Sequence, residues 1–101
     1  MACPIDQLTN DGYDYQWGVN LLGHFHLTAL LMPAILASPA PRIINLSSKG
    51  HEQAFSEGIR FDTLKGPKTP SWIPLVGLIE KYQYYGQSKL VRVAPCSFVY
   101  F

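Results

Sequence analysis

The chain has 101 residues, of which 48% are hydrophobic and 15% charged, and its net charge at pH 7 is +1. This length and composition fit a single globular domain at most. The basic residues are scattered and form no run or stripe, which argues against a nucleic-acid-binding protein. Cys3 and Cys96 have neither disulfide-framework nor zinc-site spacing, so a reducing compartment is expected.

No segment is expected to cross a membrane. The longest apolar stretch, Leu27 to Ala37, contains a threonine and a proline and is too short to span a bilayer. The N-terminus lacks the basic and apolar regions of a signal peptide. The chain is therefore predicted to be soluble and cytoplasmic.

The first predicted helix runs from about Thr9 to Leu36. Thr9 or Asn10 supplies the N-cap, and two aspartates follow near the positive end of the helix dipole. Gly23 or Pro33 would allow a bend, and a proline-rich segment ends the helix. Apolar residues recur at nearly helical spacing on most faces, so the helix is predicted to be largely buried. The first of them are Tyr13, Trp17, Leu21 and Phe25.

A predicted strand and a predicted insertion follow this helix. The run Arg42–Ser48, Arg-Ile-Ile-Asn-Leu-Ser-Ser, is β-branched and lies between a proline-rich turn and a Ser/Gly segment, which is typical of a buried parallel strand. From Lys49 to Ser71 the chain is polar and punctuated by glycine and proline. This region is predicted to be a loop or surface insertion, briefly extended only at Ile59 to Phe61.

The second predicted helix runs from about Pro74 to Val93, where apolar side chains again recur at helical spacing. Pro95 ends it, and Cys96 to Phe101 is apolar and aromatic enough to form a short strand. Residues Ser97 to Tyr100 are predicted to pair beside Ile43 to Leu46 through a right-handed crossover. The order helix, strand, insertion, helix indicates part of a parallel α/β sheet.

Tyr85 and Lys89 carry the chemistry that the pattern suggests. Four-residue spacing places a phenol and an ammonium on one face of a helix, where the positive charge would stabilise a phenolate and so make the phenol a usable acid and base. Surface packing is the alternative explanation of such a pair. Ser48 ends the predicted strand, and binding groups collect at the carboxyl ends of parallel strands. Ser48 and Tyr85 are therefore expected to converge.

Together these residues resemble the short-chain dehydrogenase/reductase family. The resemblance rests on the helix pattern Asn-x-x-Gly-x-Phe from Asn20 to Phe25, on the Arg42–Ser48 strand and on the Tyr-x-x-Ser-Lys box from Tyr85 to Lys89. The wording is most similar to the retinol-dehydrogenase-like and WW-domain-oxidoreductase-like branch, particularly its fungal members. Residues 1–90 match, whereas 91–101 form a divergent tail. A sudden loss of resemblance after Leu90 is expected if the reading frame continues past an exon boundary into an intron, or if it contains a frameshift.

The resemblance implies a fold and a set of roles. The fold would be an incomplete Rossmann-type, doubly wound parallel sheet in one partial domain over residues 1–101, with two long helices around one core strand. Tyr85 would exchange a proton with the oxygen of a small carbonyl or alcohol substrate, and Ser48, or alternatively Ser47, would hold that oxygen. Lys89 would stabilise the phenolate and bind the nicotinamide ribose. Asn20 would position a water that links Lys89 to solvent.

The resemblance also implies a cofactor, NADP or NAD, which Tyr85 and Lys89 would contact. The family's glycine-rich turn, which holds the pyrophosphate, has no counterpart in this sequence. The chain is therefore expected to be inactive alone. No metal is proposed, because His24 and His26 lie on different helix faces and are expected to pack. The alternative is a non-catalytic interaction module, in which the two long helices bind a second copy or a related reductase.

Overall fold

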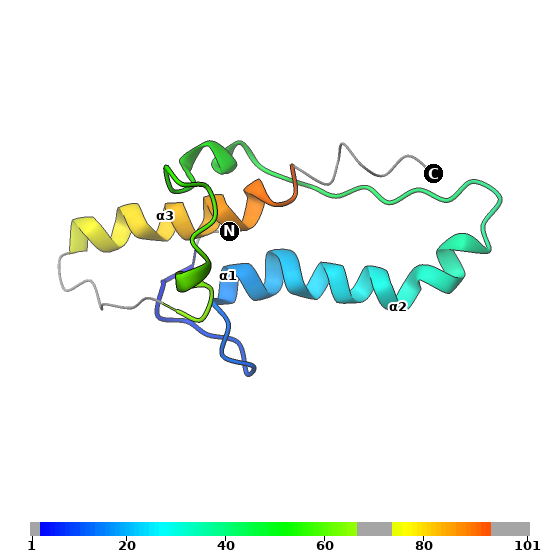
Figure 1. The fold of residues 1–101 in the computed structure, drawn as a ribbon, viewed down its shortest axis with the longest axis horizontal. Coiled ribbons are helices and arrows are strands. Elements are labelled where there is room, and N and C mark those ends of the chain that lie inside the picture. Colours follow the sequence, from blue (N-terminus) through cyan, green and yellow to red (C-terminus); the bar gives the residue numbers. More distant parts are fainter. Residues whose placement is uncertain (1–2, 67–73, 94–101) are drawn as a thin grey trace.

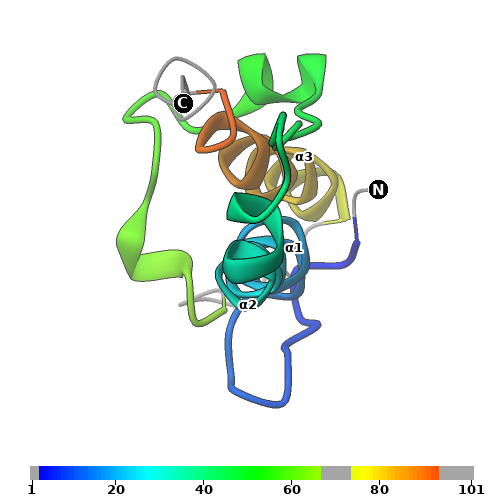
Figure 2. The ribbon, with the colours of Figure 1, turned by 90° about the vertical axis from the view of Figure 1, so that its right-hand side faces the viewer.

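The computed structural model describes residues 3–66 and 74–93, and in these residues it contains helices and no β-strand (Figure 1). The helical segment 15–36 and the helix 74–90 lie side by side over part of their length (Figures 1 and 2). The elements in chain order are α1 (Tyr15–Trp17), the π-helix η1 (Gly18–Gly23), α2 (His24–Leu36), the 3₁₀ helices η2 (Lys49–Gln53) and η3 (Phe61–Thr63), and α3 (Pro74–Leu90).

The first predicted helix is confirmed, but it begins later than expected. Asp14 is the N-cap, with one carboxylate oxygen accepting a hydrogen bond from the backbone N–H of Trp17 at 2.7 Å. Thr9 instead closes a turn with Tyr13, in which the Thr9 N–H donates to the Tyr13 carbonyl and the Tyr13 N–H donates to the Thr9 hydroxyl. Gly12 makes this turn possible with φ of +77°. The acidic residues before Asp14 thus belong to a turn.

From Tyr15 to Leu36 the elements α1, η1 and α2 follow one another without a break. The middle part, η1, is a π-helix that contains both Gly23 and Asn20. Pro33 lies inside α2, and the helix ends at Leu36, as predicted. π-Helical segments are rare and are often found near functional residues.

The prediction that this helix is largely buried is wrong. α3 packs against α1 and η1, and α2 continues beyond it without a buried residue. Phe25 is 73% exposed. The pattern is that of a helix with layers on several sides, whereas α2 has no buried residue among the described residues. By length and composition alone, Tyr15–Leu36 also suffices to cross a membrane, and its most apolar window is not buried.

The prediction of a buried strand at Arg42–Ser48 is also wrong, because the segment pairs with no described segment and is not buried. The segment is irregular, and no backbone hydrogen bond joins residues 42–47 to another described segment. Ile44 is 82% and Leu46 75% exposed, whereas their neighbours Ile43 and Asn45 are partly covered. A strand needs a neighbouring backbone to satisfy its N–H and C=O groups, and none of the described residues provides one. The α/β sheet of the expected fold is therefore absent from the described part of the chain.

The predicted insertion folds back onto α3. Phe55 is buried against Tyr84, with ring centroids 5.7 Å apart in an edge-to-face arrangement. The fully buried Gln87 accepts a hydrogen bond from the Arg60 N–H and donates one to the Thr63 hydroxyl, both at 3.2 Å. Over residues 49–66, which the structure describes, the region contains no long element, as predicted, but Gln87 and Tyr84 fix it in place. The brief extended stretch reaches only Arg60, because Phe61 begins η3.

The second predicted helix is confirmed as α3, which begins at Pro74 and ends at Leu90, three residues before the predicted end. Pro74 fits the first helical position because proline has no N–H to leave unpaired. The predicted strand in the tail, Ser97 to Tyr100, lies outside the described residues. Cys96 lies outside them as well.

The chain exposes more surface than a compact protein of its mass. Its accessible area is 7230 Å², whereas a monomeric protein of this mass exposes about 5700 Å². Its radius of gyration is 15.2 Å, against about 13 Å for a compact chain of this length. The excess of about 1500 Å² is surface that a compact protein of this mass would bury.

Candidate functional site

The side chains of Tyr85 and Ser48 both lie next to Gly50. Tyr85 is half-buried in α3, and its ring lies so close to η2 that a methyl group added at Gly50 would be 2.6 and 2.9 Å from two ring carbons. The Ser48 hydroxyl oxygen would be 3.3 Å from the same methyl. Only glycine allows this approach, which brings the phenol ring and the serine hydroxyl into one neighbourhood.

Ser48 is held by the turn that it begins. Its hydroxyl oxygen accepts a hydrogen bond from the Gly50 N–H at 3.1 Å and thereby caps η2. Its carbonyl oxygen accepts from the His51 N–H at 3.0 Å and from His51 Nδ1 at 2.6 Å. The Ser48 hydroxyl acts only as an acceptor in the described contacts, so its O–H remains able to donate.

Lys89 lies beside Tyr85, as the four-residue spacing predicts. Its Nζ atom is 5.8 Å from the centroid of the Tyr85 ring, within the range of a cation–π contact. Its backbone carbonyl accepts a hydrogen bond from the Ser47 hydroxyl at 2.9 Å. The two serines therefore differ: Ser47 is bound to the end of α3, whereas Ser48 faces the Gly50 contact with Tyr85.

Asn20 reaches α3 through Ser88. The Asn20 Nδ2 group donates to the Ser88 hydroxyl oxygen at 3.0 Å, and the Ser88 hydroxyl donates to the Tyr85 carbonyl at 2.7 Å. The structure thus gathers all four predicted site residues around the C-terminal half of α3. Among the contacts of the described residues, Asn20 is joined to the backbone of Tyr85, and not to the Lys89 side chain.

Curated relatives are short-chain dehydrogenases and retinol dehydrogenases. Short-chain dehydrogenase TIC 32 A, chloroplastic, from Brassica napus is 40% identical over 98 residues, which cover 92% of this chain and 28% of the relative. A short-chain dehydrogenase/reductase from Armillaria gallica is 49% identical over 55 residues, or 50% of this chain and 18% of the relative. These similarities support the short-chain dehydrogenase/reductase family.

Retinol dehydrogenase 13 from Homo sapiens is 55% identical over 51 residues, which cover 50% of this chain and 15% of that enzyme. The retinol-dehydrogenase-like part of the expected resemblance is thereby confirmed, whereas the WW-domain-oxidoreductase likeness and a fungal origin stay predictions. The chain spans less than a third of the length of these curated relatives. No protein-family profile matches the chain, and no solved structure matches it significantly.

A nicotinamide cofactor, which the short-chain dehydrogenase/reductase family implies, fits the described residues at one end only. The Tyr85 hydroxyl and the Lys89 ammonium lie side by side without a hydrogen-bond or ion-pair partner among the described residues, so both are available to sugar hydroxyls. The sequence has no glycine-rich turn for the pyrophosphate. The described residues could thus bind the nicotinamide ribose, whereas the sequence lacks the turn that would bind the phosphates.

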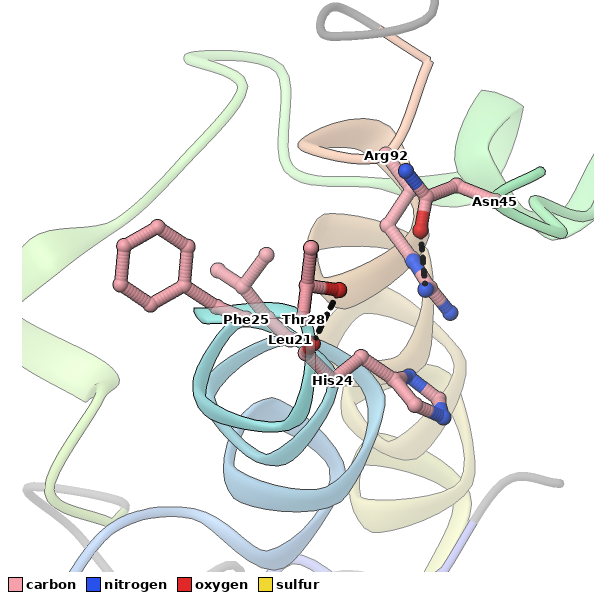
Figure 3. A pocket seen from close by; sticks show the side chains of 6 residues that line it. All are labelled: Leu21, His24, Phe25, Thr28, Asn45 and Arg92. Atoms are coloured by element: carbon pink, nitrogen blue, oxygen red, sulfur yellow. Dashed lines mark hydrogen bonds between the residues drawn. The ribbon is translucent and has the colours of Figure 1, made fainter. Parts of the chain in front are cut away.

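A separate pocket lies between α2 and the segment after Pro41. Its volume is about 130 Å³, and Figure 3 shows its lining. Arg92, only 7% exposed, donates to the Asn45 side-chain oxygen at 2.9 Å and closes one end. The lining is mainly apolar and contains no predicted site residue. It consists of Leu21, His24, Phe25, Thr28, Asn45 and Arg92. Sequence reasoning missed Arg92, because an arginine after a helix normally lies in solvent.

The expectation that His24 and His26 pack is wrong, because both side chains are exposed. His24 Nδ1 lies 3.1 Å from the Asn20 carbonyl. Residues 3–66 and 74–93 contain no group of three metal-ligating side chains. Tyr84 is buried against Phe55, and burial raises the pKa of its phenol, which therefore stays protonated at neutral pH. Tyr84 thus packs in the interior.

Proposed function

We propose that this chain carries the catalytic portion of an NAD(P)-dependent short-chain oxidoreductase that interconverts a carbonyl and an alcohol. One observation supports this most directly. The Tyr85 ring and the Ser48 hydroxyl flank Gly50, and the Lys89 ammonium lies 5.8 Å from the same ring. A substrate oxygen that met both hydroxyls would receive two hydrogen bonds beside a positive charge.

In the proposed reaction the Tyr85 hydroxyl gives its proton to the oxygen of a carbonyl substrate, or takes one from an alcohol. The Ser48 O–H donates to the same oxygen and stabilises its developing negative charge. Lys89 stabilises the phenolate that Tyr85 becomes after proton transfer. When bound, the nicotinamide supplies or accepts the hydride. Ser47 is the poorer candidate for the substrate contact, because its hydroxyl already donates to the Lys89 carbonyl.

Transfer of this chain into a relative tests the catalytic proposal. The 98 matched residues of short-chain dehydrogenase TIC 32 A would be replaced by those of this chain. We expect the chimera to consume NADPH with small aldehydes or ketones, and Tyr85→Phe to lower the rate by about 10²–10⁴-fold. Tyr82→Phe is the matched control, because Tyr82 is exposed on the same helix. An active chimera that is indifferent to Tyr85→Phe would contradict the proposal.

The cofactor part of the proposal has its own test on the chain alone. Without a glycine-rich cradle, Tyr85 and Lys89 are expected to hold neither NADPH nor NADH tightly, so the chain by itself should be inactive. Titration with NADPH, followed by its fluorescence, should show no saturation at micromolar concentrations. A micromolar dissociation constant would show that the cradle is dispensable, and the same titration with NADH would reveal any preference.

A second candidate function is a helix-mediated interaction module. It is favoured by the excess surface of about 1500 Å² and by a set of large apolar side chains on α2, each at least 47% exposed: Phe25, Leu27, Leu30, Leu31 and Leu36. Large apolar side chains exposed in such number on one helix favour an interaction surface. The occupant proposed here is a second copy of the chain, which would cover these side chains.

Light scattering tests the second candidate. We expect the chain to sediment and scatter as a dimer at micromolar concentration, and Leu30→Glu to make it monomeric by placing a charge in the apolar patch. Lys49→Glu, an exposed change outside α2, is the control. A monomer at all concentrations would exclude this function, whereas a dimer that binds no cofactor would favour it over the enzyme.

A further inference from the structure

Ser88 occupies a central place beside the site, although nothing in the proposed chemistry uses it. It is fully buried in α3, between Tyr85 and Lys89 in sequence. Its hydroxyl donates to the Tyr85 carbonyl at 2.7 Å and accepts from Asn20 Nδ2 at 3.0 Å. Both hydrogen bonds are within the normal range for strong bonds of these types. Ser88 thus joins the π-helix η1 to the turn of α3 that carries Tyr85.

The chemistry of a hydroxyl fixes the direction of both bonds. A serine hydroxyl has one O–H, and here the Tyr85 carbonyl takes it because a carbonyl can only accept. The remaining lone pairs of the Ser88 oxygen can bind only a donor. An amide N–H at position 20 supplies one, whereas a carboxylate could not. The residue type at Asn20 is thus matched to a serine whose proton is already committed.

This arrangement changes the role of Asn20. The resemblance implies that Asn20 positions a water for Lys89, but its side-chain N–H group is directed to Ser88. η1 is wound as a π-helix at this place, which alters the direction of its side chains relative to an α-helix. Tyr85 is therefore linked to η1 by two hydrogen bonds between protein groups, Asn20 to Ser88 and Ser88 to Tyr85.

We propose that Ser88 is a positioning residue, which holds the Tyr85 turn of α3 against η1, and that Asn20 acts through it. This inference rests on the proposed function, because it specifies how Tyr85 is kept facing Gly50 and Ser48. Loss of the Asn20–Ser88 bond frees this turn of α3 from η1, and loss of the Ser88–Tyr85 bond uncouples Tyr85 from that link. The Tyr85 ring then no longer stays at its contact with Gly50.

The test uses NMR on the full chain, with the cross-peak between the Tyr85 ring and the Gly50 α-protons as the readout. Asn20→Asp is nearly isosteric but brings acceptors to Ser88, so the Ser88 hydroxyl turns to the carboxylate and leaves the Tyr85 carbonyl. We expect the cross-peak to be lost in Asn20→Asp and in Ser88→Ala at pH 7, while helical circular dichroism is retained. Ser56→Ala removes an exposed serine hydroxyl and should change nothing.

A pH profile separates positioning from mere packing. Below about pH 4 the carboxyl introduced by Asn20→Asp becomes protonated and can again donate, so the cross-peak should return in that variant and stay absent in Ser88→Ala. A cross-peak that persists in both variants at pH 7 would overturn the role of Ser88. Loss that low pH fails to restore in Asn20→Asp would do the same. Absence of the cross-peak from the unchanged chain would instead overturn the proposed site itself.

Discussion

Replacement of Gly86 by alanine is expected to separate η2 from α3 and to lower the free energy of unfolding by about 1–2 kcal/mol. A methyl group at Gly86 would lie 2.6 Å from the Ala54 nitrogen, 2.7 Å from the Gly50 carbonyl oxygen and 2.8 Å from the Gln53 carbonyl carbon. All three atoms belong to the backbone, so no side chain can move aside.

Alanine also favours the helix over glycine by about 1 kcal/mol, so the sign of the change depends on which effect is larger. Overpacking against fixed backbone typically costs about 1–3 kcal/mol and occasionally more. The contact with η2 also holds Ser48 near Tyr85. We therefore expect the clash to prevail, and the Ser48 turn to move away from α3 together with η2.

Urea unfolding measures this effect, and Gly50→Ala is the matched comparison. A methyl at Gly50 meets the Tyr85 ring, which is a side chain and can swing away at lower cost. Gly50→Ala should therefore destabilise the chain less than Gly86→Ala, although it displaces the Tyr85 ring. Equal or greater stability of Gly86→Ala relative to the unchanged chain would refute the close packing of η2 on α3.

The helices could be predicted from the sequence because their signals are local. The apolar spacing through Trp17, Leu21 and Phe25 and the breaks at the proline-rich segments are determined within a few turns. The start at Asp14 was missed because Thr9 is also a good cap, and the choice between them depends on the turn at Gly12. The exposure of α2 was missed for another reason: a sequence shows which face is apolar, but not whether anything covers it.

The strand could not be predicted reliably, because pairing is a property of two segments. Ile43 and Ile44 have the β-branched side chains of a strand, yet no described segment lies where it could bond to them. The resemblance to a family with a parallel sheet led to the expectation that neighbouring strands would pair with this segment. The described residues contain no such strands, and the Arg42–Ser48 segment is therefore irregular.

The candidate site was predicted in part. Spacing placed Tyr85 and Lys89 on one face, the end of the predicted strand indicated Ser48, and the resemblance added Asn20. The residues that hold these four in place were not foreseen: Gly50 and Gly86, which let η2 approach α3, and Ser88, which joins Asn20 to Tyr85. A glycine or serine is common in any sequence, and its role becomes visible only when its neighbours in space are known.

Asp14 places a carboxyl group in the interior at a cost that depends on pH. It is fully buried, and one of its oxygens has no hydrogen-bond partner among the described residues. Burial raises its pKa from 3.8 to about 6, and hydrogen bonds from the backbone of Trp17 and Gln16 limit the rise. The folded chain therefore binds this proton more tightly than the unfolded chain does.

The direction of the pH dependence follows from this shift. The stabilisation by the bound proton is complete below about pH 3.8 and is lost as pH rises through about 6. A shift of one pKa unit corresponds to about 1.4 kcal/mol, and water near so small a fold screens part of the charge. We therefore expect the ionised carboxylate to cost about 1–3 kcal/mol of stability at pH 7 and above.

Asp14→Asn is expected to raise the free energy of unfolding at pH 7–8 by about 1–3 kcal/mol, because asparagine keeps an oxygen that can cap α1 and carries no charge. At pH 4 the gain should be small, since the carboxyl of Asp14 is then largely protonated in the folded chain. Urea unfolding at both pH values measures the difference, with Asp11→Asn, at an exposed position, as the control. An equal effect of Asp14→Asn at both pH values would show that the carboxyl of Asp14 is not the source of the pH dependence.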